Sequence, residues 1–71
     1  MTFSERLVAI RKERGLTQKN VYEGINIKEQ SYQRYEYGRV PTAAILIAIA
    51  DYFNVSVDYL LCRTDNPEIN K

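Results

Sequence analysis

The sequence predicts an all-α fold, a compact bundle of five short helices around one small core. Apolar residues recur at helical spacing almost throughout, and the alternation typical of strands is scarce. The chain has 71 residues, of which 45% are hydrophobic and 27% are charged, which is a globular composition. Because this length holds one small core, we expect neither a multidomain enzyme nor a separate ligand-binding domain.

The first helix has clear signals at both ends. Thr2 is the expected N-cap, Glu5 stands three residues later as in a capping box, and Gly15 ends the helix. Three apolar side chains on one face form its expected buried stripe: Phe3, Leu7 and Ile10.

The second helix is expected over residues 18–25, with Thr17 as its cap. Val21 and Ile25 lie four residues apart and are expected to face inward. Asn26 follows, and because asparagine tolerates the left-handed conformation, we expect a tight turn there.

A third helix is expected over residues 28–37, followed by Gly38 as its stop. Tyr32 and Tyr35 are its inward positions, with Ile27 just before it. The chain's six tyrosines are interpreted as core or core-edge side chains and not as stacking platforms for single-stranded nucleic acid.

Thr42 is the expected cap of a fourth helix over residues 43–53, and Ser56 of a fifth over 57–62. The inward side chains of the fourth helix are predicted to be Ala43, Leu46, Ile47, Ala50 and Phe53. Its outward side chains are predicted to be Ala44, Ile45, Ala48 and Tyr52.

We expect residues 1–63 to form one domain and residues 64–71 to be a flexible C-terminal tail with few apolar groups. No apolar stretch approaches the roughly 18 residues of a membrane span, and no basic segment followed by an apolar run opens the chain. We therefore expect a cytoplasmic protein with no membrane partner.

The residue types argue against an enzyme. Histidine, the usual general base and commonest zinc ligand, is absent. The single cysteine, Cys62, can form neither a disulfide within the chain nor a metal site, and no acid and base side chains converge in the pattern. We expect no enzymatic activity, no metal, no cofactor and no small-molecule ligand.

Charge and side-chain type both indicate that the front half of the chain meets a polyanion. Residues 1–39 carry eight Lys or Arg against five Asp or Glu, whereas residues 40–71 carry two against four. With its tyrosines turned inward, the helix over 28–37 presents Lys28, Glu29, Gln30, Ser31, Gln33 and Arg34. Arg can form paired hydrogen bonds to guanine and Gln to adenine, and Glu can accept a hydrogen bond from the amino group of cytosine. A helix about 10–12 Å in diameter fits a major groove about 12 Å wide.

The segment TQKNVYEGINIKEQSYQRYEYG resembles the helix-turn-helix of the Cro and phage-repressor type, also called the Xre family. The resemblance continues through VP and LIAIADYFNVSVDYLLCRTD and covers roughly residues 4–65. It implies a lambda-repressor-like domain that binds double-stranded DNA and regulates transcription, as prophage regulators do.

The resemblance also implies roles for individual residues. The base-reading positions of the family match Glu29, Gln30 and Arg34. Contacts to the DNA backbone are expected from Thr17, Gln18, Lys28, Ser31, Gln33 and Arg39. Arg11 and Glu36 match a pair that forms a partly buried salt bridge in many relatives, and an ordinary surface pair is the alternative.

The chain departs from the family pattern around the turn. Tyr22 replaces a small residue, and Asn26 replaces the usual glycine. The ring of Tyr22 is expected to widen the angle between the two helices, which would change the pose of Gln18. Because Lys28 stands where Ser or Thr usually caps the recognition helix, Asn26 is the expected cap, which would start the helix early.

Apolar side chains on the outside of the fourth helix predict contact with a second copy of the chain. The interface candidates are Ile45, Ala48, Tyr52, Val55, Val57 and Leu61. We therefore expect a homodimer that represses transcription. A two-fold dimer places two recognition helices about 34 Å apart, so its operator is expected to be near-palindromic. The alternative is a protein-interaction module, such as the antitoxin of a toxin-antitoxin pair, with DNA binding secondary.

Overall fold

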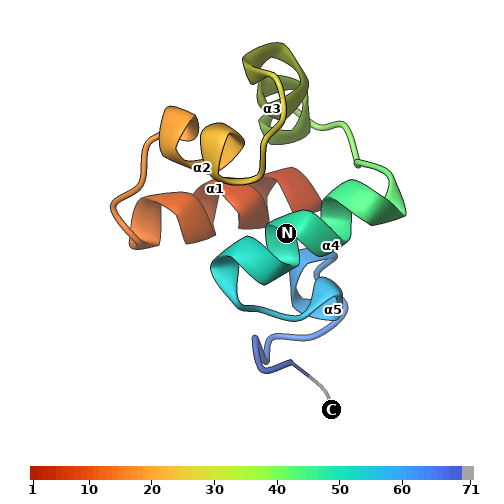
Figure 1. Ribbon diagram of the computed structural model, residues 1–71. Helices are drawn as coiled ribbons and strands as arrows, with labels where there is room; N and C mark the ends of the chain where they lie inside the picture. Colours follow the sequence, from red (N-terminus) through yellow and green to blue (C-terminus); the bar gives the residue numbers. More distant parts are fainter. Residues whose placement is uncertain (70–71) are drawn as a thin grey trace.

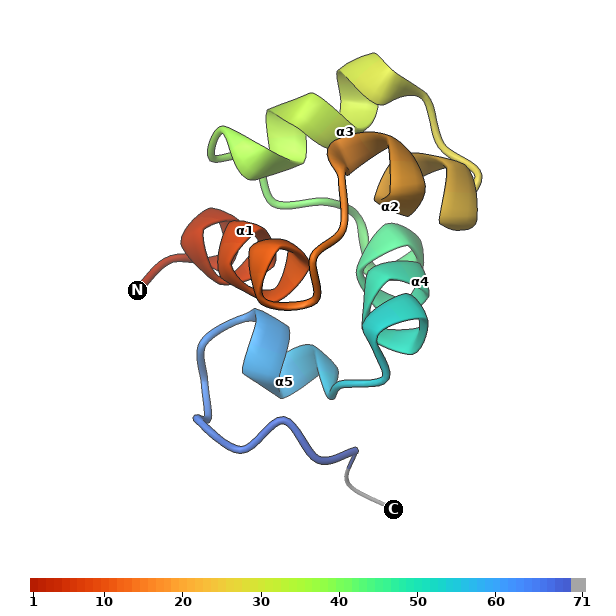
Figure 2. The same cartoon turned by 90° about the vertical axis from the view of Figure 1, so that its left-hand side faces the viewer.

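The computed structural model describes residues 1–69, which form five helices and no strand, so the all-α prediction is confirmed (Figure 1). The helices are α1 (Phe3–Glu13), α2 (Gln18–Gly24), α3 (Glu29–Glu36), α4 (Ala43–Phe53) and α5 (Val57–Leu60). In two perpendicular views α3 lies at one end of the molecule and the C-terminal segment at the other (Figures 1 and 2). None of these helices combines the length and the apolar character that crossing a membrane requires.

Two capping boxes fix the starts of α1 and α2. The Thr2 hydroxyl accepts a hydrogen bond from the Glu5 N–H at 3.2 Å, and the Glu5 carboxylate accepts one from the Thr2 N–H at 2.9 Å, as predicted. Thr17 forms the same reciprocal pair with Asn20, at 3.0 and 2.9 Å. Thr42 occupies the cap position of α4 but makes no side-chain hydrogen bond to the helix, so that part of the prediction is wrong.

Residues in the left-handed conformation separate the helices. Asn26 has φ of 60° and forms the predicted turn between α2 and α3. Gly15, with φ of 67°, follows α1. Cys62, with φ of 63°, follows α5 and ends it earlier than predicted, because a left-handed residue cannot continue a right-handed helix.

All five helices and Val55, in the loop after α4, contribute to one core. The buried apolar side chains are Phe3, Leu7, Ile10, Val21, Tyr32, Leu46, Ile49, Ala50, Phe53, Val55 and Leu60. The predicted stripe of α1 is buried in full, while Ile25 and Tyr35 pack half-buried against the edge of the core.

The face of α4 that enters the core differs from the prediction. Ile47 is 53% exposed and Ala43 is also exposed, whereas Ile49, which the prediction omitted, is fully buried. The helix is apolar on every side until Asp51, so its periodicity does not identify a buried face.

Two side chains of α4 that were expected to point outward pack inward instead. Ile45 and Tyr52 are half-buried against the core. The Tyr52 ring lies so close to Gly24 of α2 that a Cβ atom there would overlap it, and its hydroxyl donates a hydrogen bond to the Asn20 carbonyl at 3.3 Å. Val55 is buried because the chain turns back after α4, so Val55 is not available as the dimer contact that the sequence suggested.

Arg6 joins α1 to α5 and to the segment that follows. Its side chain is buried, and its guanidinium lies 4.0 Å from the centroid of the Tyr59 ring. One of its terminal nitrogens is 3.4 Å from the exposed carboxylate of Asp65. The Ser56 N–H also donates to the Pro67 carbonyl at 2.9 Å. Flexibility of the tail over 64–71 stays a prediction, and residues 70–71 lie outside the described residues.

Candidate nucleic-acid interface

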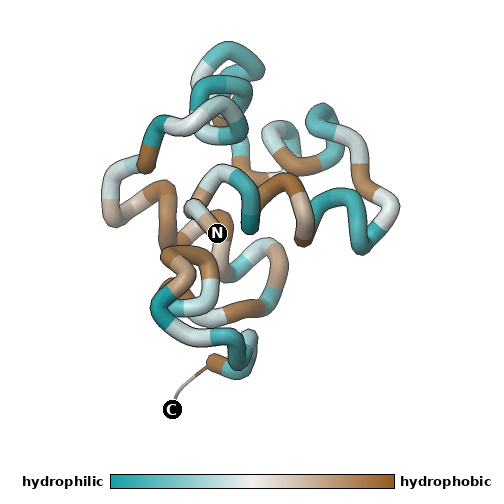
Figure 3. Tube along the Cα trace, turned by 180° about the vertical axis from the view of Figure 1, so that it is seen from behind, coloured by the Kyte–Doolittle hydropathy of each residue, from teal (hydrophilic) through white to brown (hydrophobic). Residues whose placement is uncertain are grey.

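One side of α3 packs against α1 and α2, and the other faces solvent (Figure 2). Tyr32 is fully buried and thereby fixes the rotation of the helix about its axis. Its ring centroid lies 6.4 Å from that of Tyr22, which is half-buried at the contact between α2 and α3. The trace coloured by hydropathy shows α3 as a mostly hydrophilic segment (Figure 3). The burial of Tyr32 therefore directs the polar residues of α3 outward.

The predicted base-reading residues are exposed. Glu29, Gln30 and Arg34 all face solvent. The Gln33 amide donates a hydrogen bond to the Glu29 carboxylate at 3.3 Å, which holds these two side chains together. Among residues 1–69, the side chains of Gln30 and Arg34 make no hydrogen bond or ion pair, so both are available to an external partner.

The predicted backbone-contacting residues lie at the start of α2, along α3 and just after α3. Lys28 is the N-cap residue of α3, but its side chain takes no part in capping. The expectation that Asn26 caps this helix is wrong, because its left-handed backbone forms the preceding turn. Thr17 and Arg39 are exposed, at the start of α2 and after α3, and Ser31 is half-buried.

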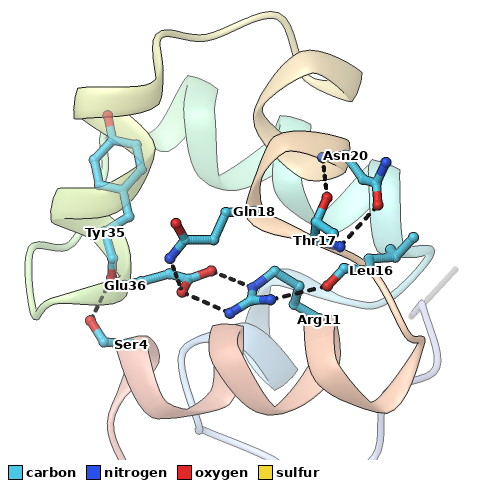
Figure 4. Close-up of polar contacts among 8 residues, drawn as sticks. All are labelled: Ser4, Arg11, Leu16, Thr17, Gln18, Asn20, Tyr35 and Glu36. Atoms are coloured by element: carbon cyan, nitrogen blue, oxygen red, sulfur yellow. Dashed lines mark hydrogen bonds and ion pairs between the residues drawn. The ribbon is translucent and has the colours of Figure 1, made fainter.

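A buried polar cluster ties the end of α3 to α1 and to the start of α2 (Figure 4). Two nitrogens of Arg11, Nε and Nη2, donate to the two carboxylate oxygens of Glu36 at 2.7 and 3.2 Å. A third, Nη1, donates to the carbonyl of Leu16 at 3.0 Å, and the Gln18 amide nitrogen donates to Glu36 at 2.9 Å. The side chains of Arg11 and Glu36 are only 13% and 3% exposed, so this is a shielded, bidentate ion pair and not an ordinary surface pair.

The cluster keeps its carboxylate ionised. Burial alone would raise the pKa of Glu36, but hydrogen bonds from Arg11 and Gln18, with the Tyr32 hydroxyl nearby, outweigh burial and hold the pKa below its ordinary value. Burial, followed by the neighbouring Glu36 carboxylate, raises the pKa of Tyr32, so its hydroxyl stays protonated. That hydroxyl has no partner at hydrogen-bond geometry within residues 1–69.

Gln18 has a different environment from the one that the sequence suggested. Its side chain was expected to contact a DNA phosphate, and the structure engages its amide nitrogen with Glu36. An amide nitrogen carries two N–H groups, so one remains for another acceptor. The phosphate contact therefore stays a prediction.

Sequence reasoning missed a second link between α1 and α3. The hydroxyl of Ser4 is buried and donates to the backbone carbonyl of Tyr35 at 2.6 Å (Figure 4). A serine in the first turn of a helix gives no signal that it is buried, because its ordinary place is at the surface. With the Arg11–Glu36 pair, this bond fixes α3 at its C-terminal end.

Within residues 1–69, α2, the turn at Asn26 and α3 form a helix-turn-helix supported by three further helices. The family described as Helix-turn-helix matches residues 7–60. This chain belongs to that family, in its Cro and phage-repressor (Xre) type, so the predicted resemblance is confirmed.

Relatives in two bacteria cover most of this chain. It is 40% identical over 68 residues to the HTH-type transcriptional regulator YqaE of Bacillus subtilis (strain 168), which covers 94% of this chain and 59% of that protein. It is 33% identical over 72 residues to ImmR of the same organism, with 100% and 57% covered. It is 39% identical over 64 residues to the cryptic phage CTXphi transcriptional repressor RstR of Vibrio cholerae, with 89% and 57% covered. The chain spans somewhat more than half of the length of these relatives.

Proposed function

We propose that this chain is a sequence-specific DNA-binding transcriptional regulator whose α3 enters the major groove. One observation carries the proposal: α3 turns Tyr32 into the core and leaves Gln30 and Arg34 exposed, without partners among residues 1–69. Arg and Gln are the side chains that pair best with guanine and adenine in that groove. Gln30 and Arg34 read the sequence, and Glu29 excludes wrong bases.

In the same proposal, other residues set the position of the domain on the duplex. Lys28 and Arg39 contact phosphates, together with the free amide hydrogen of Gln18 and the backbone N–H groups at the start of α2. The bound protein represses transcription in the cytoplasm by occupying its operator. The names of the relatives support regulation of transcription and do not favour an antitoxin-like role.

A two-fold homodimer on a near-palindromic operator belongs to this proposal. Val57 of α5 and exposed Ile47 of α4 line one surface hollow and are the better contact candidates. Tyr52, in contrast, already packs on α2. We expect operators with two half-sites about one duplex turn apart, which is about 34 Å.

Selection of binding sites from a random pool of duplex DNA tests the proposal. On the selected site, Arg34→Ala should cost about 1–3 kcal/mol of binding free energy and relax the preference at one base pair. Lys28→Ala should weaken selected and random duplexes alike, and should lower the slope of log affinity against log salt by about 1. Absence of duplex binding at low ionic strength, or equal losses on both DNAs for both variants, would overturn it.

A further inference from the structure

Tyr37 differs from the other tyrosines of the recognition helix. Tyr32 is fully buried and Tyr35 is half-buried at the edge of the core, whereas Tyr37 is 80% exposed. Its backbone is still close to helical, with φ of −96° and ψ of 2°, and its N–H still donates to the Arg34 carbonyl at 3.2 Å. The side chain of Tyr37 therefore points in the direction that it would have if α3 continued by one residue. The sequence alone had placed it among the core-edge tyrosines.

The helical spacing places Tyr37 on the side of α3 that faces DNA in the proposed function. Gln30, Gln33, Arg34 and Tyr37 stand at positions i, i+3, i+4 and i+7. At about 100° per residue these four side chains fall within an arc of about 100°, with Tyr37 near its middle. Along the helix axis Tyr37 is about 10 Å from Gln30, which is close to the width of a major groove.

The surroundings of Tyr37 indicate what its hydroxyl meets. The C-terminal end of a helix carries a partial negative charge, which by itself repels a phosphate. The Glu36 carboxylate beside it is already paired with Arg11 and 3% exposed, so it adds little repulsion. Close approach of the DNA backbone here requires a donor, and within residues 37–41 the donor-bearing side chains are those of Tyr37 and Arg39, both exposed.

We infer that Tyr37 is a DNA-contact residue whose phenolic hydroxyl donates a hydrogen bond to a phosphate oxygen at the wall of the groove while its ring covers the adjoining deoxyribose. The inference rests on the proposed function and adds to it a contact at the C-terminal end of α3. It makes Tyr37 a positioning residue: phosphate contacts set register and orientation, and base contacts carry sequence preference.

Tyr37→Phe removes the hydroxyl and keeps the ring, so it tests the hydrogen bond alone. On the selected operator and on random duplex, we expect affinity to fall by about tenfold in both cases. The slope of log affinity against log salt should stay unchanged, because a neutral hydroxyl releases no counterion, whereas Arg39→Ala should lower it by about 1. Tyr37→Ala should lose more than Tyr37→Phe, since the ring is also lost.

Replacing single operator phosphates with neutral methylphosphonates locates the contact. One substituted phosphate should abolish the difference between the wild-type chain and Tyr37→Phe, as coupled partners do in a double-mutant cycle. Tyr59→Phe removes a hydroxyl from a tyrosine of α5, a helix that the proposed DNA contacts do not use, and is the matched control, with affinity unchanged. Thermal unfolding followed by circular dichroism should give Tyr37→Phe the same midpoint as the wild type.

The outcomes separate this inference from the proposed function. Wild-type affinity for Tyr37→Phe, with lost discrimination for Arg34→Ala, overturns the role of Tyr37 and leaves the proposed function standing. If Tyr37→Phe instead loses affinity only on the selected operator and relaxes the preference at one base pair, Tyr37 reads a base, and its assignment to a phosphate is overturned. Failure of the wild-type chain to bind any duplex overturns both.

Discussion

The two mostly buried arginines of α1 are held in contrasting ways. Arg11 meets a buried carboxylate through two nitrogens and a backbone carbonyl through a third. Arg6 lies over the ring of Tyr59, reaches only the exposed carboxylate of Asp65, and its Nε has no partner among residues 1–69. Arginine thus forms a bidentate ion pair that joins α1 to α3. On the other side of α1, the same side-chain type makes a weaker contact with α5. We infer that α3 is positioned more firmly than α5.

Removing the stronger contact should have the largest effect. Arg11→Met keeps the apolar stem of the side chain but leaves the Glu36 carboxylate buried with only neutral donors. Removing one partner of a buried pair typically costs about 3–5 kcal/mol, so we expect the free energy of unfolding to fall by about 3 kcal/mol in urea denaturation at pH 7. Arg11→Lys keeps the positive charge but not the two-pronged guanidinium, so its free energy of unfolding should lie between those of the wild type and Arg11→Met. If Arg11→Met lowers the free energy of unfolding by less than about 1 kcal/mol, the Arg11 contact is not stronger than the Arg6 contact.

The same carboxylate should make stability depend on pH. The pKa of Glu36 in the folded chain lies below its ordinary value of 4.5, so the folded state binds this proton more weakly than the unfolded state does. The contribution of Glu36 is therefore complete above about pH 4.5 and is lost as pH falls through the lower folded pKa.

Glu36→Gln removes this titration, so its thermal midpoint should fall less steeply below pH 4.5 than that of the wild type. Glu5→Gln is the matched control: the pKa of Glu5 is also lowered, by the Thr2 backbone N–H, but its carboxyl is fully exposed. Glu5→Gln should therefore change the acid limb less than Glu36→Gln. Acid limbs of equal steepness in the wild type and Glu36→Gln would assign the pH dependence to other groups.

The smallest effect is expected on the α5 side. Arg6→Met removes the contact over Tyr59, which is worth about 1 kcal/mol, and also removes a buried nitrogen without a partner. We expect a net loss of about 1 kcal/mol or less in urea denaturation. Asp65→Asn should leave stability unchanged, because its carboxylate is exposed to solvent. If Arg6→Met lowers the free energy of unfolding as much as Arg11→Met does, the two arginines stabilise the fold equally.

The parts of the fold that the sequence predicted well are those with local signals. Thr2 and Glu5 announce the start of α1, and Asn26 announces the turn before α3, because capping and left-handed residues act within a few positions. The outward face of α3 was predictable because Tyr32 and Tyr35 are spaced to lie on one side of a helix, and the residues on the other side are polar.

The parts that it predicted poorly depend on contacts between distant segments. The apolar α4 offered no polar residue before Asp51 to select its buried face, so Ile47 was assigned inward and Tyr52 outward. Gln18 and Ser4 find their partners 18 and 31 residues away, at a distance that periodicity does not report. Six tyrosines treated as one class concealed the exposure of Tyr37.

The Tyr52 ring seated on Gly24, with its hydroxyl bonded to the Asn20 carbonyl, has a mechanical consequence. It locks α4 to the helix that precedes α3, and closely packed interiors transmit displacement because they have little room to absorb it. A displacement of α4, such as one that a second subunit of the proposed dimer would cause, is therefore expected to move α2 and, with it, α3. In the proposed dimer on DNA, we expect subunit association and operator affinity to be coupled through this one aromatic contact.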